Sequence, residues 1–375
     1  MTFKVTALAM ASVGAVTALG AMATESHAQT PQPPAMKADD SGTMQRADKD
    51  MKRVLEKLLA LGAKPLGTQS VEETRKGPTP ADAVKAVLKD DGKDPAALIA
   101  QMKVKKQDMS YPTAGGSQPI RIYTPEDAGA GPLPVIVYYH GGGWVIADLD
   151  TYESSAMALA KKTKAIVASV EYRHAPENKF PAAHEDAFAA YQWVLKNAGQ
   201  FGGDPARTAL AGESAGGNLA TNVAIMARDQ KVQAPVHMLL VYPVAGTDMN
   251  TPSYQKNANA IPLSKQGMEW FVKHTIGNEK DLQSPMLDLI GKANVKGLPP
   301  ATVITAEIDP LLSDGKMLAD KLEKAGVKMS YQNYDGVAHE FFGMDAVVAD
   351  AAKAQDMAAK QLRDAFAAKA TRAAR

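Results

Sequence analysis

Two hydrophobic periods alternate along most of the chain. From residue 133 onward, short apolar runs of strand length are separated by stretches in which apolar residues recur every three or four positions. The run 133–139 is continuously apolar, as expected of a strand buried on both faces. This alternation predicts an α/β protein with a mostly parallel, doubly wound sheet. The predicted strands are 106–111 and 120–123, joined as a hairpin, then 133–139, 165–172, 208–211, 237–242, 301–306 and 328–334, and the predicted helices among them are 152–162, 181–196, 218–228, 311–325 and an Ala-rich helix at the C-terminus.

Two other segments carry helical patterns outside this alternation. Residues 51–59 form one apolar stripe at helical spacing, and two more short helices are predicted at 80–88 and 95–102. Residues 248–299 have little strand pattern and include a helix-like stretch at 265–274. Three short helices make a poor core alone, so we expect them to form an accessory layer, with the 248–299 insertion over the carboxyl edge of the sheet.

The N-terminus has the pattern of a secretory signal peptide. Lys4 precedes an uncharged, Ala-rich run at 5–24, and small residues occupy the positions before a cleavage site after Ala28. Ala23 is a second candidate site, and a retained membrane anchor is the alternative, although the run is weakly hydrophobic for that role. We therefore expect a periplasmic or secreted protein with no stable membrane insertion after cleavage, and a disordered linker at 29–43.

Composition excludes several kinds of site. The chain of 375 residues contains no cysteine, which excludes disulfides, thiolate nucleophiles and zinc–thiolate centres. A formal charge of +1 provides no field for binding nucleic acid. Neither His184-Glu185 nor His339-Glu340 is followed by a second histidine at helical spacing, so we expect no metal and no cofactor.

A G-x-S-x-G motif runs from Gly212 to Gly216, with Glu213, Ser214 and Ala215 between the glycines. A strand-like run precedes it and a helix-like run follows, so the glycines can form a tight strand-to-helix turn that exposes the serine hydroxyl. This arrangement predicts Ser214 as a nucleophile. A small-residue turn that matches the motif by chance is the alternative.

A second glycine-rich segment, His140-Gly141-Gly142-Gly143-Trp144, closes the strand at 133–139. Consecutive glycines leave backbone N–H groups free to point at a ligand, as an oxyanion hole requires. A phosphate loop is the alternative, but no Lys-Ser/Thr follows and the G-x-G-x-x-G spacing is absent. The segment therefore predicts an oxyanion loop that serves Ser214.

His339 is the predicted general base. It follows the last predicted strand, and a loop there returns to the edge of the sheet where Ser214 lies. We expect His140 to shape the glycine loop by hydrogen bonding, and His184 and His274 to be surface or packing residues.

Asp309 is the predicted orienting acid, because it follows a strand and precedes His339 in the chain order serine, acid, histidine. Asp314 lies about one turn into the next helix, where we expect a solvated or capping role. We expect Glu307 to belong to the strand, and Asp335 is too near His339 in sequence to face it.

These motifs together resemble the hormone-sensitive-lipase-like branch of the α/β-hydrolase carboxylesterases, the bacterial family IV esterases. The resemblance departs from the common pattern at Glu213, at His174 and at residues 312–315, and it runs from about Met44 to the C-terminal helix. The matching motifs are His140–Trp144, Tyr172-Arg173-His174-Ala175-Pro176-Glu177, Phe180-Pro181-Ala182-Ala183, Gly203-Asp204-Pro205, Gly212–Ala220, Asp309-Pro310-Leu311 and His339-Glu340-Phe341-Phe342.

The resemblance implies an α/β-hydrolase fold with a helical cap. It implies a triad of Ser214, Asp309 and His339, with an oxyanion hole formed by the amides of Gly142, Gly143 and Ala215. The implied domains are a signal peptide at 1–28, a linker at 29–43, an N-terminal helical cap segment at 44–105 and a catalytic domain at 106–375 with a cap insertion at about 248–299.

The predicted activity is that of a serine carboxylesterase acting on a small-molecule ester. Trp144, Trp270 and Phe271 suggest an apolar acyl pocket, and the resemblance implies a short-to-medium acyl chain. The same triad could act on amides, thioesters or xenobiotic esters, and a non-catalytic exported binding protein is a further alternative. The sequence is compatible with a homodimer.

Overall fold

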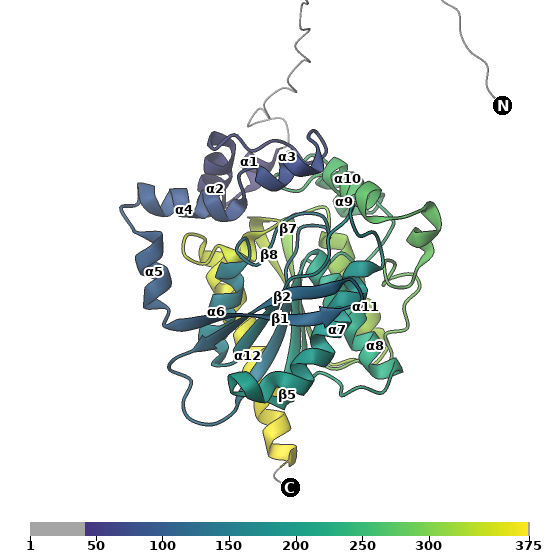
Figure 1. Ribbon diagram of the computed structural model, residues 1–375. Coiled ribbons are helices and arrows are strands. Elements are labelled where there is room, and N and C mark those ends of the chain that lie inside the picture. Colours follow the sequence, from purple (N-terminus) through teal and green to yellow (C-terminus); the bar gives the residue numbers. More distant parts are fainter. Residues whose placement is uncertain (1–41, 374–375) are drawn as a thin grey trace, which may run out of the picture. The chain divides into compact units, whose positions relative to one another are not determined.

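A computed structural model describes residues 42–373 (Figure 1). The predicted signal peptide 1–28, its cleavage after Ala28 and nearly all of the 29–43 linker lie outside the described residues. No helix within 42–373 is long and apolar enough to cross a membrane.

The core is one eight-stranded sheet with the strand order β1-β2-β4-β3-β5-β6-β7-β8. β1 pairs with β2, and β2 with β4, in antiparallel fashion, and all other neighbours are parallel. The prediction of a mostly parallel, doubly wound sheet is therefore confirmed. The strands are β1 (Val104–Thr113), β2 (Gly116–Pro125), β3 (Leu133–Tyr139), β4 (Ile166–Val170), β5 (Gly203–Glu213), β6 (Met238–Val241), β7 (Ala301–Ile308) and β8 (Met329–Ala338).

Helices cover both faces of the sheet, and the alternation of strand side chains divides the core in two. In β3, Val135 and Val137 pack in the core under α7, α8 and α11, whereas Ile136 and Tyr138 pack in the core under α6 and α12. Burial on both faces explains why the central strands are continuously apolar. The covering helices are α6 (Glu153–Thr163), α7 (Ala182–Asn197), α8 (Ala215–Asp229), α11 (Leu312–Lys324) and α12 (Ala349–Ala373), with short 3₁₀ helices η1 (Ala198–Phe201) and η3 (Phe341–Gly343).

The chain before the sheet is helical, as predicted. Met51, Val54, Leu55 and Leu58 form the buried stripe of α2, which packs against α4. The short helices α1 and α3 were not predicted; α3 begins with a capping box in which Ser70 and Glu73 satisfy each other's backbone amides. The helices are α1 (Thr43–Arg46), α2 (Lys49–Ala60), α3 (Val71–Lys76), α4 (Pro80–Asp90) and α5 (Pro95–Gln101).

The insertion after β6 approaches this N-terminal layer. It contains α9 (Pro252–Lys256), α10 (Lys265–Thr275) and η2 (Glu279–Gln283). Figure 1 shows α1–α3 beside α9 and α10, above β7 and β8. Leu66 lies against Gly267 at the start of α10, so close that a Cβ added there would be 3.0 Å from the Leu66 Cβ. Two segments far apart in sequence therefore cover the same edge of the sheet.

Strand register brings the motif-bearing loops to that edge. Tyr139 of β3 pairs with Gly212 of β5, and Ile308 of β7 pairs with Ala338 of β8. The residues that directly follow these pairs therefore leave the sheet at its carboxyl edge, where ligand sites of open α/β sheets form.

Candidate active site

Ser214 occupies the turn between β5 and α8 in a strained backbone conformation. Its φ is 55° and its ψ is −118°, a region that non-glycine residues rarely adopt. The turn is held from both sides, because the Ser214 amide donates to the Val241 carbonyl (2.9 Å) and the Ser214 carbonyl accepts from Val244 (3.1 Å). The strained serine is thus fixed by the neighbouring strand and the loop after it.

The glycines of this turn are required by close backbone approach. A Cβ on Gly212 would collide with the Gly216 carbonyl oxygen, and a Cβ on Gly216 would collide with that of Tyr139. The start of α8 can therefore lie directly against the ends of β3 and β5 only because both residues lack a side chain.

Asp309 and His339 form a buried hydrogen-bonded pair. Asp309 Oδ2 is 2.6 Å from His339 Nδ1, and Asp309 Oδ1 accepts the Leu311 amide (2.8 Å). Burial lowers the pKa of His339, but the charge and hydrogen bond of Asp309, with smaller effects of Glu340 and Glu213, outweigh it, so the pKa is raised. The pair leaves Nε2 of His339 as the ring nitrogen available to a substrate or nucleophile.

Asn257 supports the Asp309 loop from the insertion. Its Nδ2 donates to the backbone carbonyls of Asp309 (2.8 Å) and Glu307 (3.0 Å), and its Oδ1 accepts from Arg46 (2.7 Å). The sequence pattern gave no sign of this role, because Asn257 belongs to no motif and does not directly follow a predicted strand.

The expectation of a solvated or capping Asp314 was wrong. Asp314 is buried and accepts two hydrogen bonds, from the amides of Ala245 (3.0 Å) and Gly246 (2.8 Å). Burial raises the pKa of Asp314 to about 7, although these two amides favour its charged form. It anchors the loop after β6 and does not contact His339.

The other two carboxylates are occupied elsewhere. Glu307 belongs to β7, as predicted, and accepts the Gly336 amide (3.0 Å). Asp335 is exposed and accepts from Asn333 Nδ2 (2.7 Å).

The glycine loop after β3 lies against the same cavity as Ser214 and His339. Gly142 and Gly143 line that cavity and have φ values of 86° and 58°. Ala215 is the first residue of α8, so its amide has no partner within the helix. Amides at these positions can donate hydrogen bonds to a ligand bound beside Ser214.

His140 shapes this loop, as predicted. Its Nδ1 is 2.9 Å from the Gly141 carbonyl oxygen, and the Tyr172 hydroxyl donates to the carbonyls of both His140 (2.9 Å) and Gly141 (3.0 Å). The His140 and Tyr172 side chains therefore fix the backbone of the loop.

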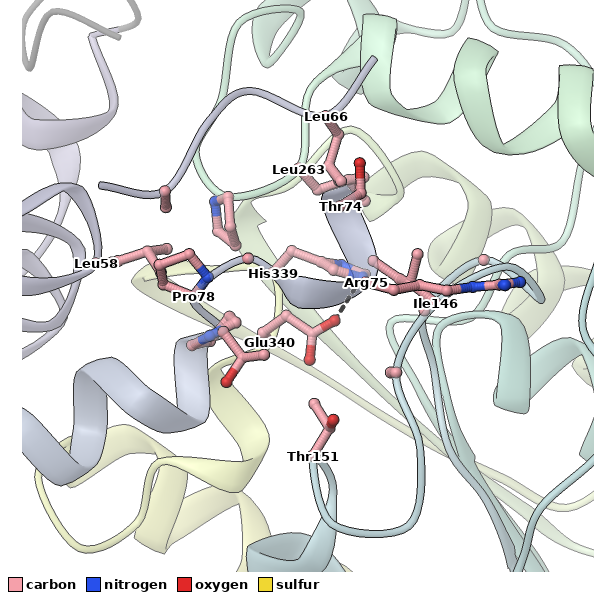
Figure 2. Close-up of a pocket in the computed structure, with 18 of the residues that line it drawn as sticks. Leu58, Leu66, Thr74, Arg75, Pro78, Ile146, Thr151, Leu263, His339 and Glu340 are labelled. Carbon is pink, nitrogen blue, oxygen red and sulfur yellow. Dashed lines mark ion pairs between the residues drawn. The ribbon is translucent and has the colours of Figure 1, made fainter. Parts of the chain in front are cut away.

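The cavity has a volume of about 270 Å³ and a mostly apolar lining. Figure 2 shows Leu58, Leu66 and Pro78 of the N-terminal segment and Leu263 of the insertion around His339 and Glu340. Its polar lining includes Thr74, Thr151 and Arg75, but the Arg75 guanidinium is engaged by Glu177 and by the carbonyls of Val145 and Ala175.

Of the three aromatic residues expected to line an acyl pocket, only Phe271 lines this cavity among the described residues. Trp144 lies with its ring centroid 5.9 Å from that of buried His184, and Trp270 with its ring 4.6 Å from that of His274. The sequence suggested that both tryptophans line the acyl pocket, but their rings pack against these two histidines instead. His184 and His274 are thus packing residues, as expected.

Comparisons with known proteins identify the family of this chain. A family model described as alpha/beta hydrolase fold matches residues 136–343. The carboxylesterase NlhH of Mycobacterium tuberculosis is 39% identical over 265 residues, which cover 70% of this chain and 82% of the relative. An arylesterase of Saccharolobus solfataricus is 35% identical over 257 residues, covering 67% of this chain and 79% of the relative.

A solved structure of an esterase from Pyrobaculum calidifontis superposes with a TM-score of 0.73 at 32% identity, over 85% of this chain and 98% of that one. The chain belongs to the hormone-sensitive-lipase-like branch of the α/β-hydrolase carboxylesterases. The protein is therefore a carboxylic ester hydrolase, and the alternative of a non-catalytic binding protein is set aside.

The esterase site contains a carboxylate that the sequence analysis did not assign. Glu340 has a left-handed backbone (φ 73°), accepts a hydrogen bond from the Tyr152 hydroxyl (2.6 Å) and lies 3.8 Å from His339 Nε2 (Figure 2). Burial raises the pKa of Glu340, and the nearby His339 opposes that effect. The only signal in the sequence was its position directly after His339.

Glu213, which the sequence left without a role, lies in a buried hydrogen-bond network near His339. Its carboxylate is buried and accepts hydrogen bonds from the hydroxyls of Tyr138 (2.5 Å) and Tyr242. The Tyr242 ring lies 4.4 Å from the His339 ring, centroid to centroid. Burial raises the pKa of Glu213 to about 7 against the effect of the two tyrosines. The residue before Ser214 thus supports the ring that packs on His339.

Glu213→Gln tests this buried acid through the pH dependence of stability. Because the folded pKa is raised, the neutral acid stabilises the enzyme fully below about pH 4.5, and this contribution is lost as the pH rises through about 7. We expect the unfolding free energy of the wild type, relative to Glu213→Gln, to fall by up to about 3 kcal/mol between pH 5 and pH 8.

Urea unfolding at both pH values measures this difference. Glu72→Gln, at an exposed position, serves as the control and is expected to follow the wild type. A difference between wild type and Glu213→Gln that is the same at pH 5 and pH 8 would contradict the assignment.

Proposed function

We propose that this esterase is a serine carboxylesterase that hydrolyses short-to-medium acyl esters through an acyl-enzyme on Ser214. The observation that carries the proposal is the 2.6 Å bond between Asp309 and His339, with His339 lining the same cavity as Ser214, Gly142 and Gly143. A nucleophile, an oriented base and free backbone amides at one cavity are the parts that acyl transfer requires.

Acylation begins with attack of the Ser214 hydroxyl oxygen on the ester carbonyl, while His339 Nε2 takes the hydroxyl proton. The amides of Gly142, Gly143 and Ala215 stabilise the oxyanion that forms. The tetrahedral intermediate then expels the alcohol, which takes its proton from His339. The buried Asp309 carboxylate stabilises the imidazolium present between these two transfers.

Deacylation repeats the sequence with water. His339 accepts a proton from water as the hydroxyl attacks the acyl carbonyl, and it returns that proton to Ser214 as the acid is released. Metal and cofactor chemistry are not needed in any step of this scheme.

The size and lining of the cavity support a small acyl group. Its volume of about 270 Å³ is just below the usual range of ligand pockets, and leucine, isoleucine and proline side chains make up most of its apolar lining. Among the relatives, one is named an ethyl acetate hydrolase and another an arylesterase, which favours esters over amides and thioesters as substrates. Amide, thioester and xenobiotic ester hydrolysis by the same triad stay as the alternative.

Ser214→Ala tests the nucleophile. We expect kcat/KM for p-nitrophenyl butyrate to fall by at least about 10⁴-fold, because removal of the nucleophile abolishes the acyl-enzyme route. Ser117→Ala, which removes an exposed hydroxyl of β2 outside this cavity, is the matched control and should retain most of the activity. Equal rates for wild type and Ser214→Ala would refute the mechanism.

Acyl length tests the cavity. With p-nitrophenyl esters of two to sixteen carbons, we expect kcat/KM to peak at a short-to-medium chain and to fall for the longest chains. Phe271→Ala should extend the range toward longer chains, because its ring lies against Gly143 in the lining. A profile that rises steadily to sixteen carbons would contradict the proposed substrate class.

We further propose that the enzyme is exported, on the strength of the signal-peptide pattern in residues 1–28. Expression of the full chain in a Gram-negative host should give periplasmic protein whose N-terminus is Gln29. N-terminal sequencing of the fractionated protein measures this, and a cytoplasmic chain that retains residues 1–28 would refute export.

A further inference from the structure

Three potential metal ligands converge behind the oxyanion loop. His140 follows β3, whereas Glu171 and His174 follow the adjacent parallel strand β4. His140 Nε2 and His174 Nε2 lie 3.4 Å and 3.1 Å from the same oxygen of Glu171, Oε1. Within residues 42–373 this is the one group of three such side chains, and its ligand atoms all lie within 4.8 Å of one another.

The hydrogen bonds of His140 fix which ring nitrogen can bind a cation. Nδ1 is 2.9 Å from the Gly141 carbonyl oxygen, which can only accept, so Nδ1 carries a hydrogen. In neutral His140, the lone pair of Nε2 then points toward the Glu171 oxygen. Metal-binding histidines commonly donate their second N–H to a backbone carbonyl in this way.

His174 provides an independent observation. Its Nε2 is buried and lies 3.1 Å from Glu171 Oε1. This contact does not have hydrogen-bond geometry, so Nε2 has no hydrogen-bond partner. A buried polar atom without a partner is costly, and a cation between the two groups would satisfy both.

We propose that His140, Glu171 and His174 form a Zn²⁺ site that fastens the oxyanion loop to the segment after β4. Two imidazoles and a carboxylate suit zinc, and Zn–N and Zn–O bonds of about 2.0–2.1 Å place tetrahedral ligand atoms roughly 3.3 Å apart. The observed separations of 3.4 Å and 3.1 Å match this spacing. A water molecule would complete the coordination, and no residue of the proposed triad is a ligand.

Two of the three ligands are partly exposed to solvent. The His140 side chain is fully buried, but Glu171 and His174 retain exposed fractions of 16% and 17%. A metal ion can therefore reach the ligands past these two side chains.

Equilibrium dialysis of the tag-free, chelator-treated enzyme against Zn²⁺, with metal analysis of the protein, tests the site. We expect about one Zn²⁺ per chain with a Kd below about 10 µM, and at least a tenfold weaker Kd in His174→Leu and in Glu171→Gln. His274→Leu is the matched control, because it removes a histidine that packs against Trp270 and does not belong to the cluster, and its Kd should equal that of the wild type.

Thermal unfolding with and without Zn²⁺ is the second readout. We expect saturating Zn²⁺ to raise the Tm of the wild type and of His274→Leu by a few degrees, with no rise in the two ligand variants. A cooperative melting transition without metal shows that a variant is folded. If His174→Leu does not fold, Glu171→Gln alone tests the site. The proposal is overturned if the wild type binds less than a tenth of an equivalent of Zn²⁺, which would mean that only protons bridge the three side chains. It is also overturned if the ligand variants bind Zn²⁺ as tightly as the wild type.

Discussion

The buried hydrogen bond between Asp309 and His339 is the interaction on which the rest of the site depends. A carboxylate without exposure to water is tolerated only when it is paired and hydrogen-bonded, and here His339 and the Leu311 amide share that role. The fold is arranged to hold both partners: adjacent parallel strands β7 and β8 present them at one edge, and Asn257 fixes the Asp309 backbone from the insertion. The insertion is therefore part of the support of the site as well as its cover.

Two further acidic side chains lie around His339 beyond its direct partner. Glu340 lies on the Nε2 side of the ring, and Glu213 reaches the ring through Tyr242, which packs on it. Tyrosine hydroxyls satisfy both carboxylates, since Tyr152 donates to Glu340 and Tyr138 donates to Glu213. Both groups raise the pKa of His339, so in the proposed mechanism they favour its imidazolium form. Their cost is the burial of two further acids, which is why their pKa values are raised.

The fold could be predicted from the sequence because buried parallel strands are continuous apolar runs, as 133–139 shows. The position of Asp309 after a strand and before His339 also distinguished it from the other candidate acids. The environment of Asp314 could not be predicted, because it depends on a loop distant in sequence. The rings of Trp144 and Trp270 pack against His184 and His274, and residue type alone does not give the direction of a side chain. The cluster of His140, Glu171 and His174 has no helical metal-binding spacing and becomes visible only when β3 and β4 lie side by side.

The central claim is that Ser214 is activated by the Asp309–His339 pair. The most direct measurement is the rate at which diethyl p-nitrophenyl phosphate modifies the enzyme, followed by intact-protein and peptide mass spectrometry. The account predicts a single adduct on Ser214 and a modification rate at least about 100-fold lower in Asp309→Asn, because the amide holds the wrong tautomer of His339. An adduct on another residue, or an unchanged rate in Asp309→Asn, would contradict it.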